Sequence, residues 1–571
     1  MTPRRSLLLV LTIGLAVRLV NIQGMSRLPM AEYQFQAPEA DMSLAYEWSG
    51  RILSGDLLGR DTVHAYTMWM HEIAPLETWE RWWGGAHIFY QAPLYAYTLA
   101  AFRLVAGDRF WPIALCQALL GLANVTLVFL LAERLFAGAA AAIAALGAAL
   151  YGPFQLHELF VLRDTLGVTV SLLMLWALAR CDDADPRRWL LAGLLLAVAM
   201  LCREATLLFV PLVAVWMLRR FRADGRVLGR AALWLLAGVG LGLAPLIARN
   251  IAVGAPPFSL SAQGIVTFVE ANAPGSAGFA WRVPPETRSI LERANGHLGT
   301  AVRLTLASYH GDWWSFLALQ TLKLRAIFAS YEATDNINAY YVADHLPLLR
   351  FSLRFEHVLA LGLIGLWLER ANGARNRILR YFLATALGSL MYSTVVGRYR
   401  LPGTAVLLLY AAAAVHWAGG RIARREWRAL ALAGVAGVGI MLVSTNLLRA
   451  AGLRMRYPPR EYSNNAVLYY ERGQIDEACG ELRRGLEKAD AWPDHSALPP
   501  QYVALLARPY VTLAHTLHRD GEAVAVLERL ASSFPADGAL EELIGVLYRD
   551  GLNRPDEAAR HLERARELGP R

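Results

Sequence analysis

The chain has 571 residues, of which 56% are hydrophobic and only 18% are charged. A mean hydropathy of +0.32 is too high for a water-soluble globular protein or a disordered chain. The formal net charge of +9 would indicate a nucleic-acid partner only if the arginines gathered on one soluble face. They are instead divided among short loops between apolar runs, so the composition predicts a membrane protein that binds no nucleic acid.

The amino terminus and the cysteines further restrict the kind of membrane protein that the sequence predicts. Arg4 and Arg5 precede an apolar run over residues 6–22 that resembles a signal peptide, but no small-x-small cleavage site follows it. We therefore expect a retained first transmembrane helix. The four cysteines form no CxxC pair, and the sequence has no HExxH motif. Neither a disulfide framework nor a zinc site is predicted.

The apolar runs predict an all-α polytopic membrane protein, because a crossing helix needs about 20 apolar residues. We expect about eleven spans, at residues 6–23, 110–132, 139–156, 165–180, 189–202, 205–218, 231–251, 357–369, 378–396, 402–418 and 429–448. The stretch 90–106 is apolar enough to compete. If it crossed, the dense arginine clusters at 219–230 and 370–380 would face away from the cytoplasm, so we expect it to lie at the outer face.

This topology divides the chain into two domains. The amino terminus is then cytoplasmic, and residues 1–450 form a transmembrane domain with long loops outside the cytoplasm at 24–109 and 252–356. The tail, 451–571, also lies outside the cytoplasm. It repeats a helix-opening motif at 35- and 45-residue intervals, which resembles tetratricopeptide repeats: Asp476-Glu477-Ala478, Gly521-Glu522-Ala523 and Asp556-Glu557-Ala558. Two interpretations stay open, a small packing domain or a groove for a protein partner.

Two carboxylates stand out, because acidic groups beside apolar spans are costly and so indicate function. Asp41 lies in the first outer loop, and Asp164 lies at the outer end of a predicted span. In this topology both lie at the same membrane surface, where they can share a site. The structural alternatives are that Asp41 caps a surface helix and that Asp164 forms an interfacial salt bridge with Arg163.

Three arginines oppose the positive-inside trend. Arg203, Arg398 and Arg400 all lie between spans on the outer side of this topology. A guanidinium binds phosphate oxygens in a bidentate manner, so an anionic lipid headgroup would suit them. The alternatives are snorkelling, or pairing with Glu204 and other nearby carboxylates.

The order of several short motifs resembles the GT-C superfamily of membrane glycosyltransferases. It is closest to the bacterial glycosyltransferase family 39-like branch, related to protein O-mannosyltransferases and aminoarabinose transferases, some with tetratricopeptide tails. The residues that carry the resemblance are Asp41, Tyr46 and Trp48, then Ser54-Gly55-Asp56, Gln91-Ala92-Pro93-Leu94-Tyr95, Glu133-Arg134-Leu135-Phe136, Ala149-Leu150-Tyr151-Gly152-Pro153 and Leu162-Arg163-Asp164.

The resemblance implies a GT-C fold in a bacterial inner membrane, and transfer of a sugar from a polyprenyl-phosphate carrier to an acceptor outside the cytoplasm. Asp41 would be the general base of a single displacement that inverts the anomeric carbon. Asp164 would orient the partner of Asp41, the acceptor or an arginine. The resemblance further implies donor-phosphate binding by Arg163, Arg203, Arg398 and Arg400, and substrate contacts by Tyr46, Gln91, Glu332 and Asn336. It implies no certain cofactor besides the lipid-linked donor, and leaves a divalent cation open.

The sequence departs from the family pattern at two places. Met42 follows Asp41 where many relatives have Glu, and Gln91-Ala92-Pro93 replaces an acidic residue and Lys before Pro. These departures argue against the aminoarabinose reaction in particular. Two alternatives remain: an O-antigen ligase or O-oligosaccharyltransferase that uses a carrier diphosphate and a loop histidine, with His345 as candidate, or a non-catalytic flippase or scaffold that needs only the arginines or the tail.

Overall fold

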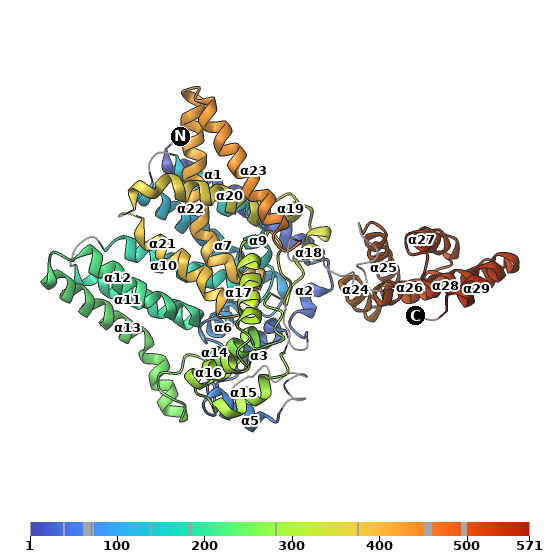
Figure 1. Cartoon of the computed structure of the whole chain (residues 1–571), viewed down its shortest axis with the longest axis horizontal. Helices are drawn as coiled ribbons and strands as arrows, with labels where there is room; N and C mark the ends of the chain where they lie inside the picture. Colours follow the sequence, from blue (N-terminus) through green and yellow to red (C-terminus); the bar gives the residue numbers. More distant parts are fainter. Residues whose placement is uncertain are drawn as a thin grey trace. The chain divides into compact units, whose positions relative to one another are not determined.

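The computed structural model describes residues 2–37, 40–60, 70, 74–136, 139–181, 185–279, 283–373, 376–449, 460–492 and 500–569. Within these ranges every regular element is a helix (Figure 1), and the one β-type pairing is an isolated bridge between Tyr151 and Leu353. The all-α prediction is therefore confirmed. The chain divides into two compact units, of which the first is Met1–Ser26 with Ala31–Leu453 and the second is Arg27–Met30 with Arg454–Arg571.

The first unit opens with short and long helices in alternation. They are α1 (Pro3–Met25), α2 (Met30–Tyr33), α3 (Asp41–Leu53), α5 (Leu76–Trp83), α6 (Leu94–Ala106), α7 (Phe110–Leu135), α8 (Ala140–Leu150), α9 (Gly152–His157), α10 (Asp164–Ala179), α11 (Pro186–Cys202), η1 (Glu204–Phe209), α12 (Val210–Arg220) and α13 (Gly225–Val253).

Its second half runs from a group of small helices back to long apolar ones. They are α14 (Gln263–Asn272), α15 (Thr287–Ala294), α16 (Leu298–Ala307), α17 (Trp313–Phe328), α18 (Ala339–His345), α19 (Pro347–Arg350), α20 (Phe355–Leu368), η2 (Glu369–Asn372), α21 (Arg377–Gly388), η3 (Ser389–Met391), η4 (Gly397–Arg400), α22 (Leu401–Ala423) and α23 (Trp427–Asn446).

Five helices of the described chain are long and apolar enough to cross a bilayer: α1, α7, α13, α22 with the turn before it, and α23. The chain is thus a membrane protein, but the count of eleven spans is not confirmed. Several predicted spans are interrupted where proline cannot continue a helix. The stretch 139–156 divides into α8 and α9 with Pro153 in the first turn of α9, and 205–218 divides into η1 and α12 with Pro211 in the first turn of α12.

The competing stretch 90–106 forms α6, which has 13 residues. At about 1.5 Å per residue such a helix is roughly 20 Å long, shorter than a hydrocarbon core of about 30 Å. It packs against α3 and α7, so it belongs to the group of elements that surrounds Asp41.

Close helix contacts in this unit depend on glycine. Helices α11 and α13 lie side by side (Figure 1), and Gly193 and Gly238 lie where their backbones meet. A Cβ added at Gly238 would lie 2.1 Å from the carbonyl oxygen of Leu190, and one at Gly193 would lie 2.0 Å from that of Leu235. Small residues of this kind let membrane helices approach closely.

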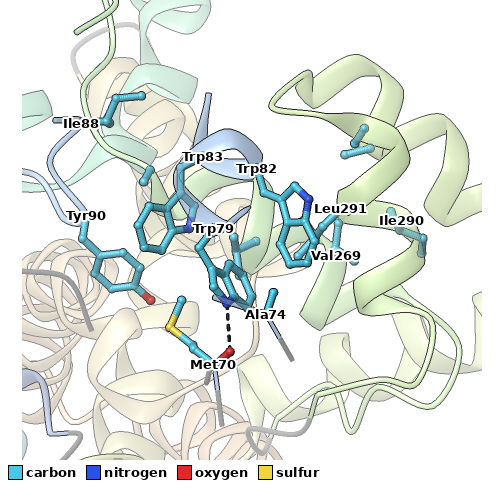
Figure 2. Close-up of a cluster of buried hydrophobic side chains, with 14 of the residues drawn as sticks. Met70, Ala74, Trp79, Trp82, Trp83, Ile88, Tyr90, Val269, Ile290 and Leu291 are labelled. Atoms are coloured by element: carbon cyan, nitrogen blue, oxygen red, sulfur yellow. Dashed lines mark hydrogen bonds between the residues drawn. The ribbon is translucent and has the colours of Figure 1, made fainter. Parts of the chain in front are cut away.

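The two long loops that the sequence predicted share a second core. Figure 2 shows α5 placing Trp79, Trp82 and Trp83 against side chains of α14 and α15, and all three indoles are buried. Trp79 Nε1 donates a hydrogen bond to the carbonyl oxygen of Met70 at 3.0 Å. Residues from 24–109 and 252–356 therefore fold as one body, although the mostly helical segment 110–251 separates them in the sequence.

The second unit consists of helices packed in sequence. They are α24 (Arg460–Glu471), α25 (Ile475–Asp490), α26 (Pro500–Thr516), α27 (Asp520–Ser533), α28 (Gly538–Val546), η7 (Leu547–Gly551) and α29 (Pro555–Leu568). The three repeated motifs open α25, α27 and α29, and their alanines, Ala478, Ala523 and Ala558, are all buried. The helical periodicity is present, while the tetratricopeptide assignment stays a prediction.

The α11–α13 contact generates a stability prediction. We expect Gly238→Ala to destabilise the protein by about 1–3 kcal/mol, because the new methyl group meets backbone atoms that cannot rotate away. The measurement is the thermal unfolding midpoint of the purified protein in detergent. Gly240→Ala is the matched control on the same helix, since nothing lies within 4 Å of its added Cβ, and it should be neutral or slightly stabilising. Equal midpoints for the two variants would contradict the close approach.

Candidate active site

Asp41 is the first residue of α3, and two other parts of the chain hold it. Its backbone N–H donates to Asn336 Oδ1 at 2.8 Å, and its Oδ2 accepts from Asn336 Nδ2 at 3.0 Å. Gln91 Nε2 donates to its Oδ1 at 2.7 Å. The carboxylate caps no helix end in the described structure, so the alternative of a surface N-cap does not account for it.

Arg398 lies between three carboxylates. Its Nη2 lies 2.5 Å from Asp41 Oδ2 and 2.5 Å from Asp335 Oδ2, and its Nη1 lies 3.6 Å from Asp164 Oδ2. It belongs to the η4 turn that precedes α22, and only 6% of its side chain is exposed. One guanidinium thus joins the first loop, the second loop and the start of α10.

Asp164 opens α10 and is fully buried. It forms an ion pair with Arg203, the residue at which α11 ends. The positive end of the α10 dipole favours a carboxylate at this position. Gly167 leaves room for the arginine, because a Cβ there would lie 2.8 Å from Arg203 Nε. Asp164 therefore forms buried ion pairs with Arg203 and Arg398, and not the interfacial salt bridge that was considered as the alternative.

Arg163 has a different carboxylate partner. Its Nη1 lies 3.3 Å from Glu204 Oε2, and its Nη2 donates to Gln263 Oε1 at 3.0 Å. Glu204 Oε1 also accepts from the backbone N–H of Ala92 at 2.8 Å. Glu204 therefore connects the break between α11 and η1 to Ala92, the residue that follows Gln91.

Arg400 fastens the loop before α18. Its Nη2 lies 2.8 Å from Glu332 Oε2, and its Nη1 donates to the carbonyl oxygen of Ala329 at 2.6 Å. Its guanidinium carbon lies 4.0 Å from the ring centroid of Phe355. A Cβ at Gly397 would lie 2.2 Å from Glu332 Oε2, so a side chain there would displace the carboxylate that pairs with Arg400. The contacts of Arg400 thus stabilise the loop that contains Asp335 and Asn336.

Nine of the ten residues that the sequence singled out lie in this connected group, and the tenth, Tyr46, lies apart from it. The Tyr46 ring lies 3.8 Å from the guanidinium carbon of Arg103 and 4.6 Å from the ring centroid of Phe35. These contacts give it a packing role in the described structure. A role in binding substrate stays a prediction without a contact to support it.

Sequence reasoning missed four members of the group. The Tyr399 ring centroid lies 5.2 Å from the guanidinium carbon of Arg398 and 5.4 Å from that of Arg203. Asp335 and Tyr399 are adjacent in sequence to residues that were singled out, whereas Glu204 was considered only as a partner of arginine. Gln263 carried no motif, and no sequence signal could have found it. His345 lies elsewhere, with its Nδ1 3.0 Å from the carbonyl oxygen of Tyr341.

The group contains four arginines and five carboxylates, yet two guanidinium N–H groups remain without partners. Nε of Arg203 and Nε of Arg398 are buried and have no hydrogen-bond partner within the described residues. A buried, unpaired donor on a charged group is expensive. These two groups are therefore the natural donors for an anionic ligand.

The ionisation of Asp41 follows from its neighbours. Burial alone would raise the pKa of this carboxyl group, but the charge and hydrogen bond of Arg398 outweigh burial and hold the pKa below its ordinary value. Burial would also raise the pKa of Glu204, but the charge of Arg163, together with hydrogen bonds from Ser261 and from backbone N–H groups, outweighs burial and lowers the pKa. Both carboxyl groups are thus ionised at neutral pH.

A cavity adjoins the group on the side of the second loop. It is lined by Pro153, Leu156, His157, Glu332, Ala333, Asp335, Asn336, Ile337, Ala339, Val396, Gly397 and Arg398. Arg398 and Asn336 also contact Asp41, so a molecule in the cavity lies next to the candidate base. Among the described residues, no group of three or more His, Cys, Asp or Glu side chains is arranged to hold a metal ion.

Residues 90–248 match the family model described as dolichyl-phosphate-mannose-protein mannosyltransferase. The matched segment includes Gln91, Arg163, Asp164, Arg203 and Glu204. No curated protein matches the chain.

Solved structures show distant similarity. The archaeal oligosaccharyltransferase AglB from Archaeoglobus fulgidus, in complex with an inhibitory peptide and a dolichol-phosphate, is 13% identical over 87% of this chain and 59% of that chain, with a TM-score of 0.42. The oligosaccharyltransferase of the same organism with Zn and sulfate is 16% identical over 86% and 57%, with a TM-score of 0.41.

ArnT from Cupriavidus metallidurans in the apo state is 17% identical over 59% of this chain and 71% of that chain, with a TM-score of 0.22. The chain spans about three fifths of the length of the archaeal enzyme. The family match covers the break of α11 and two of the four arginines of the site. The similarity to the dolichyl-phosphate-mannose-protein mannosyltransferase family thus extends over residues 90–248 of an all-helical chain with long apolar helices.

Proposed function

We propose that this protein transfers a sugar from a polyprenyl-phosphate carrier to a hydroxyl group of an acceptor outside the cytoplasm. The observation that carries the proposal is the pairing of an ionised Asp41 with the buried Arg398, which shares Asp164 with Arg203. Each of these two guanidinium groups keeps an unused Nε–H donor. A base for a hydroxyl group and donors for a phosphate lie in one site, which is what a displacement at a glycosyl phosphate requires.

The reaction balances in one step. The acceptor oxygen forms a bond to the anomeric carbon, its proton passes to Asp41, and the bond between that carbon and the phosphate oxygen breaks with its electron pair on the phosphate. The sugar is therefore inverted. A phosphate leaves as a stable anion, so no acid has to protonate it, unlike the alkoxide in glycoside hydrolysis. Positive charge from Arg203 and Arg398 is sufficient to stabilise its departure.

Arg398 links donor binding to base strength. Its Nη2 lies 2.5 Å from Asp41 Oδ2, and the low pKa makes the carboxylate a weak base. A donor phosphate competes for the same guanidinium. When the guanidinium of Arg398 binds the phosphate, it stabilises the charge of Asp41 less. The pKa of Asp41 then rises, and the carboxylate becomes a better proton acceptor. The base is thus strengthened when a donor is present.

The other residues have supporting roles in this proposal. Gln91 and Asn336 orient Asp41 through the hydrogen bonds described above. Asp164 positions Arg203 and Arg398, and Arg163 and Arg400 hold Glu204 and Glu332 in place around them. A divalent cation remains a further component that activity measurements with chelators would reveal.

We further propose a location. The positive-inside rule supports a cytoplasmic amino terminus in a bacterial inner membrane, with the two long loops and the tail outside the cytoplasm. No nucleotide sugar is available on that side, so a lipid-linked donor suits a site at the ends of apolar helices. The helical tail is available for a protein partner.

Asp41→Asn provides the direct test. The amide cannot accept the proton, so we expect transfer from a radiolabelled polyprenyl-phosphate sugar to fall by about 10²- to 10⁴-fold. Purified protein is incubated with a panel of such donors and membrane-derived acceptors, and labelled product is counted. Glu47→Gln is the control on the same helix, because that side chain is 56% exposed and pairs only with Arg51. Full transfer by Asp41→Asn, with loss in His345→Ala, would favour the ligase alternative instead.

Arg398→Gln tests the electrostatic link. Without this guanidinium, burial dominates and the pKa of Asp41 rises above its present low value. The base is then protonated at higher pH, so the acidic limb of the kcat/KM profile should move upward by about 1–3 pH units. Arg51→Gln, an exposed arginine on α3, should leave that limb in place. An unmoved acidic limb in a folded Arg398→Gln protein would disprove the proposed pairing.

A further inference from the structure

Four helices of the first unit end beside a tryptophan that an arginine covers. In each pair the guanidinium carbon lies 4.0 to 5.7 Å from the centroid of the tryptophan ring. The pairs are Trp176 with Arg180 at the end of α10, Trp216 with Arg220 in α12, Trp367 with Arg370 at the end of α20, and Trp417 with Arg421 in α22. Tryptophan is enriched at the headgroup level of a bilayer, and arginine on its cytoplasmic side. The pairs therefore indicate the depth at which these helices leave the lipid.

Hydrogen bonds join two of these helix ends to the start of α21. Arg219 Nη1, at the end of α12, donates to the hydroxyl oxygen of Tyr381 at 2.7 Å. Arg380 Nη2 donates to the carbonyl oxygen of Glu369, directly after α20, at 2.5 Å. The ends of α12 and α20 and the start of α21 thus lie on one face of the helix bundle. The proposed topology places this face at the cytoplasmic surface of the membrane.

A pocket opens on this face between α20 and α21. Its volume is about 300 Å³, and its walls are Leu366 of α20 and Arg380, Leu383 and Ala384 of α21. Three of these four side chains are apolar, and Ala384 is exposed at the surface. Alkyl walls with a single cation suit a molecule that combines an alkyl chain with an anion.

Arg380 keeps a donor that the protein does not use. Its Nη2 is bound to the carbonyl oxygen of Glu369, but its Nε is buried and has no hydrogen-bond partner within the described residues. An unpaired donor on a buried part of a charged group is costly. The planar guanidinium matches the geometry of phosphate oxygens, so a phosphate group can supply the missing partner.

We infer that the pocket between α20 and α21 binds an anionic phospholipid of the bilayer, with its phosphate at Arg380 and an acyl chain along Leu366 and Leu383. The ligand is a lipid because the walls are apolar and the tryptophan–arginine pairs place the pocket at the headgroup level. It is anionic because Arg219 and Arg370 make the surrounding face basic, and a basic face attracts lipids of net negative charge.

The pocket is a site of its own. None of its four lining residues belongs to the candidate active site, so the inference does not depend on the transfer reaction. It uses the proposed topology only to say that the lipid comes from the cytoplasmic leaflet. A bound lipid of this kind would stabilise the two helices that the pocket separates, because it binds the folded protein alone.

The test compares two lipids with identical acyl chains, dioleoylphosphatidylglycerol and dioleoylphosphatidylcholine. Each is titrated into the purified full chain in detergent, and native mass spectrometry measures the lipid-bound fraction. The wild type should prefer the anionic lipid. Arg380→Gln should lose about 5- to 10-fold of that preference, the value of one arginine against an anionic lipid. Arg230→Gln is the control and should retain the preference, because this arginine of α13 is exposed and does not line the pocket.

Ala384→Phe tests the pocket without removing a charge or a core side chain. Because Ala384 is exposed, the fold accommodates the larger ring, which occupies the pocket and should weaken binding of the anionic lipid as much as Arg380→Gln does. Unchanged binding of that lipid in both variants would overturn the inference. An equal loss in Arg230→Gln would also overturn it, since the whole basic face would then attract the lipid. Displacement of the lipid by millimolar inorganic phosphate would indicate a site for a free anion and contradict a lipid as the ligand.

Discussion

The candidate site depends on one buried guanidinium. Arg398 contacts carboxylates that come from α3, from the start of α10 and from the loop before α18. Removing a charged group from water costs several kcal/mol, and only close opposite charges and hydrogen bonds offset that cost. The three acidic residues and the arginine therefore require one another, and together they hold three segments that are more than a hundred residues apart.

The same constraint accounts for where the site lies. Charged side chains are costly inside an apolar helix bundle, and those of the candidate site lie where helices end or break. Asp41 and Asp164 open helices, Arg203 ends one, and Arg398 occupies a turn before another. Helix ends leave backbone groups and dipoles that charged side chains satisfy. The interruptions that shorten several apolar helices are thus the positions from which chemistry can be performed.

Sequence reasoning succeeded where a strong physical preference acts locally. Composition and apolar runs were enough for the all-α membrane fold, and the cost of charge beside apolar spans led to Asp41, Asp164 and the arginines. It was less successful where several weak preferences compete. Proline divides the stretches 139–156 and 205–218 into shorter helices, so the expected number of spans stays a prediction. Tyr46 follows the motif order but packs on Arg103, since an aromatic ring beside an arginine is satisfied by that contact alone.

The sequence by itself determined the helical class, the membrane location and the residue types of the site, because hydrophobic length and the cost of buried charge are properties of short segments. Only the tertiary structure decided which charges pair. It joined Arg163 to Glu204, Arg203 to Asp164 and Arg400 to Glu332, and it brought His157 to the wall of a cavity shared with Arg398. Pairing and cavity shape depend on packing between distant segments, and no local pattern in the chain specifies them.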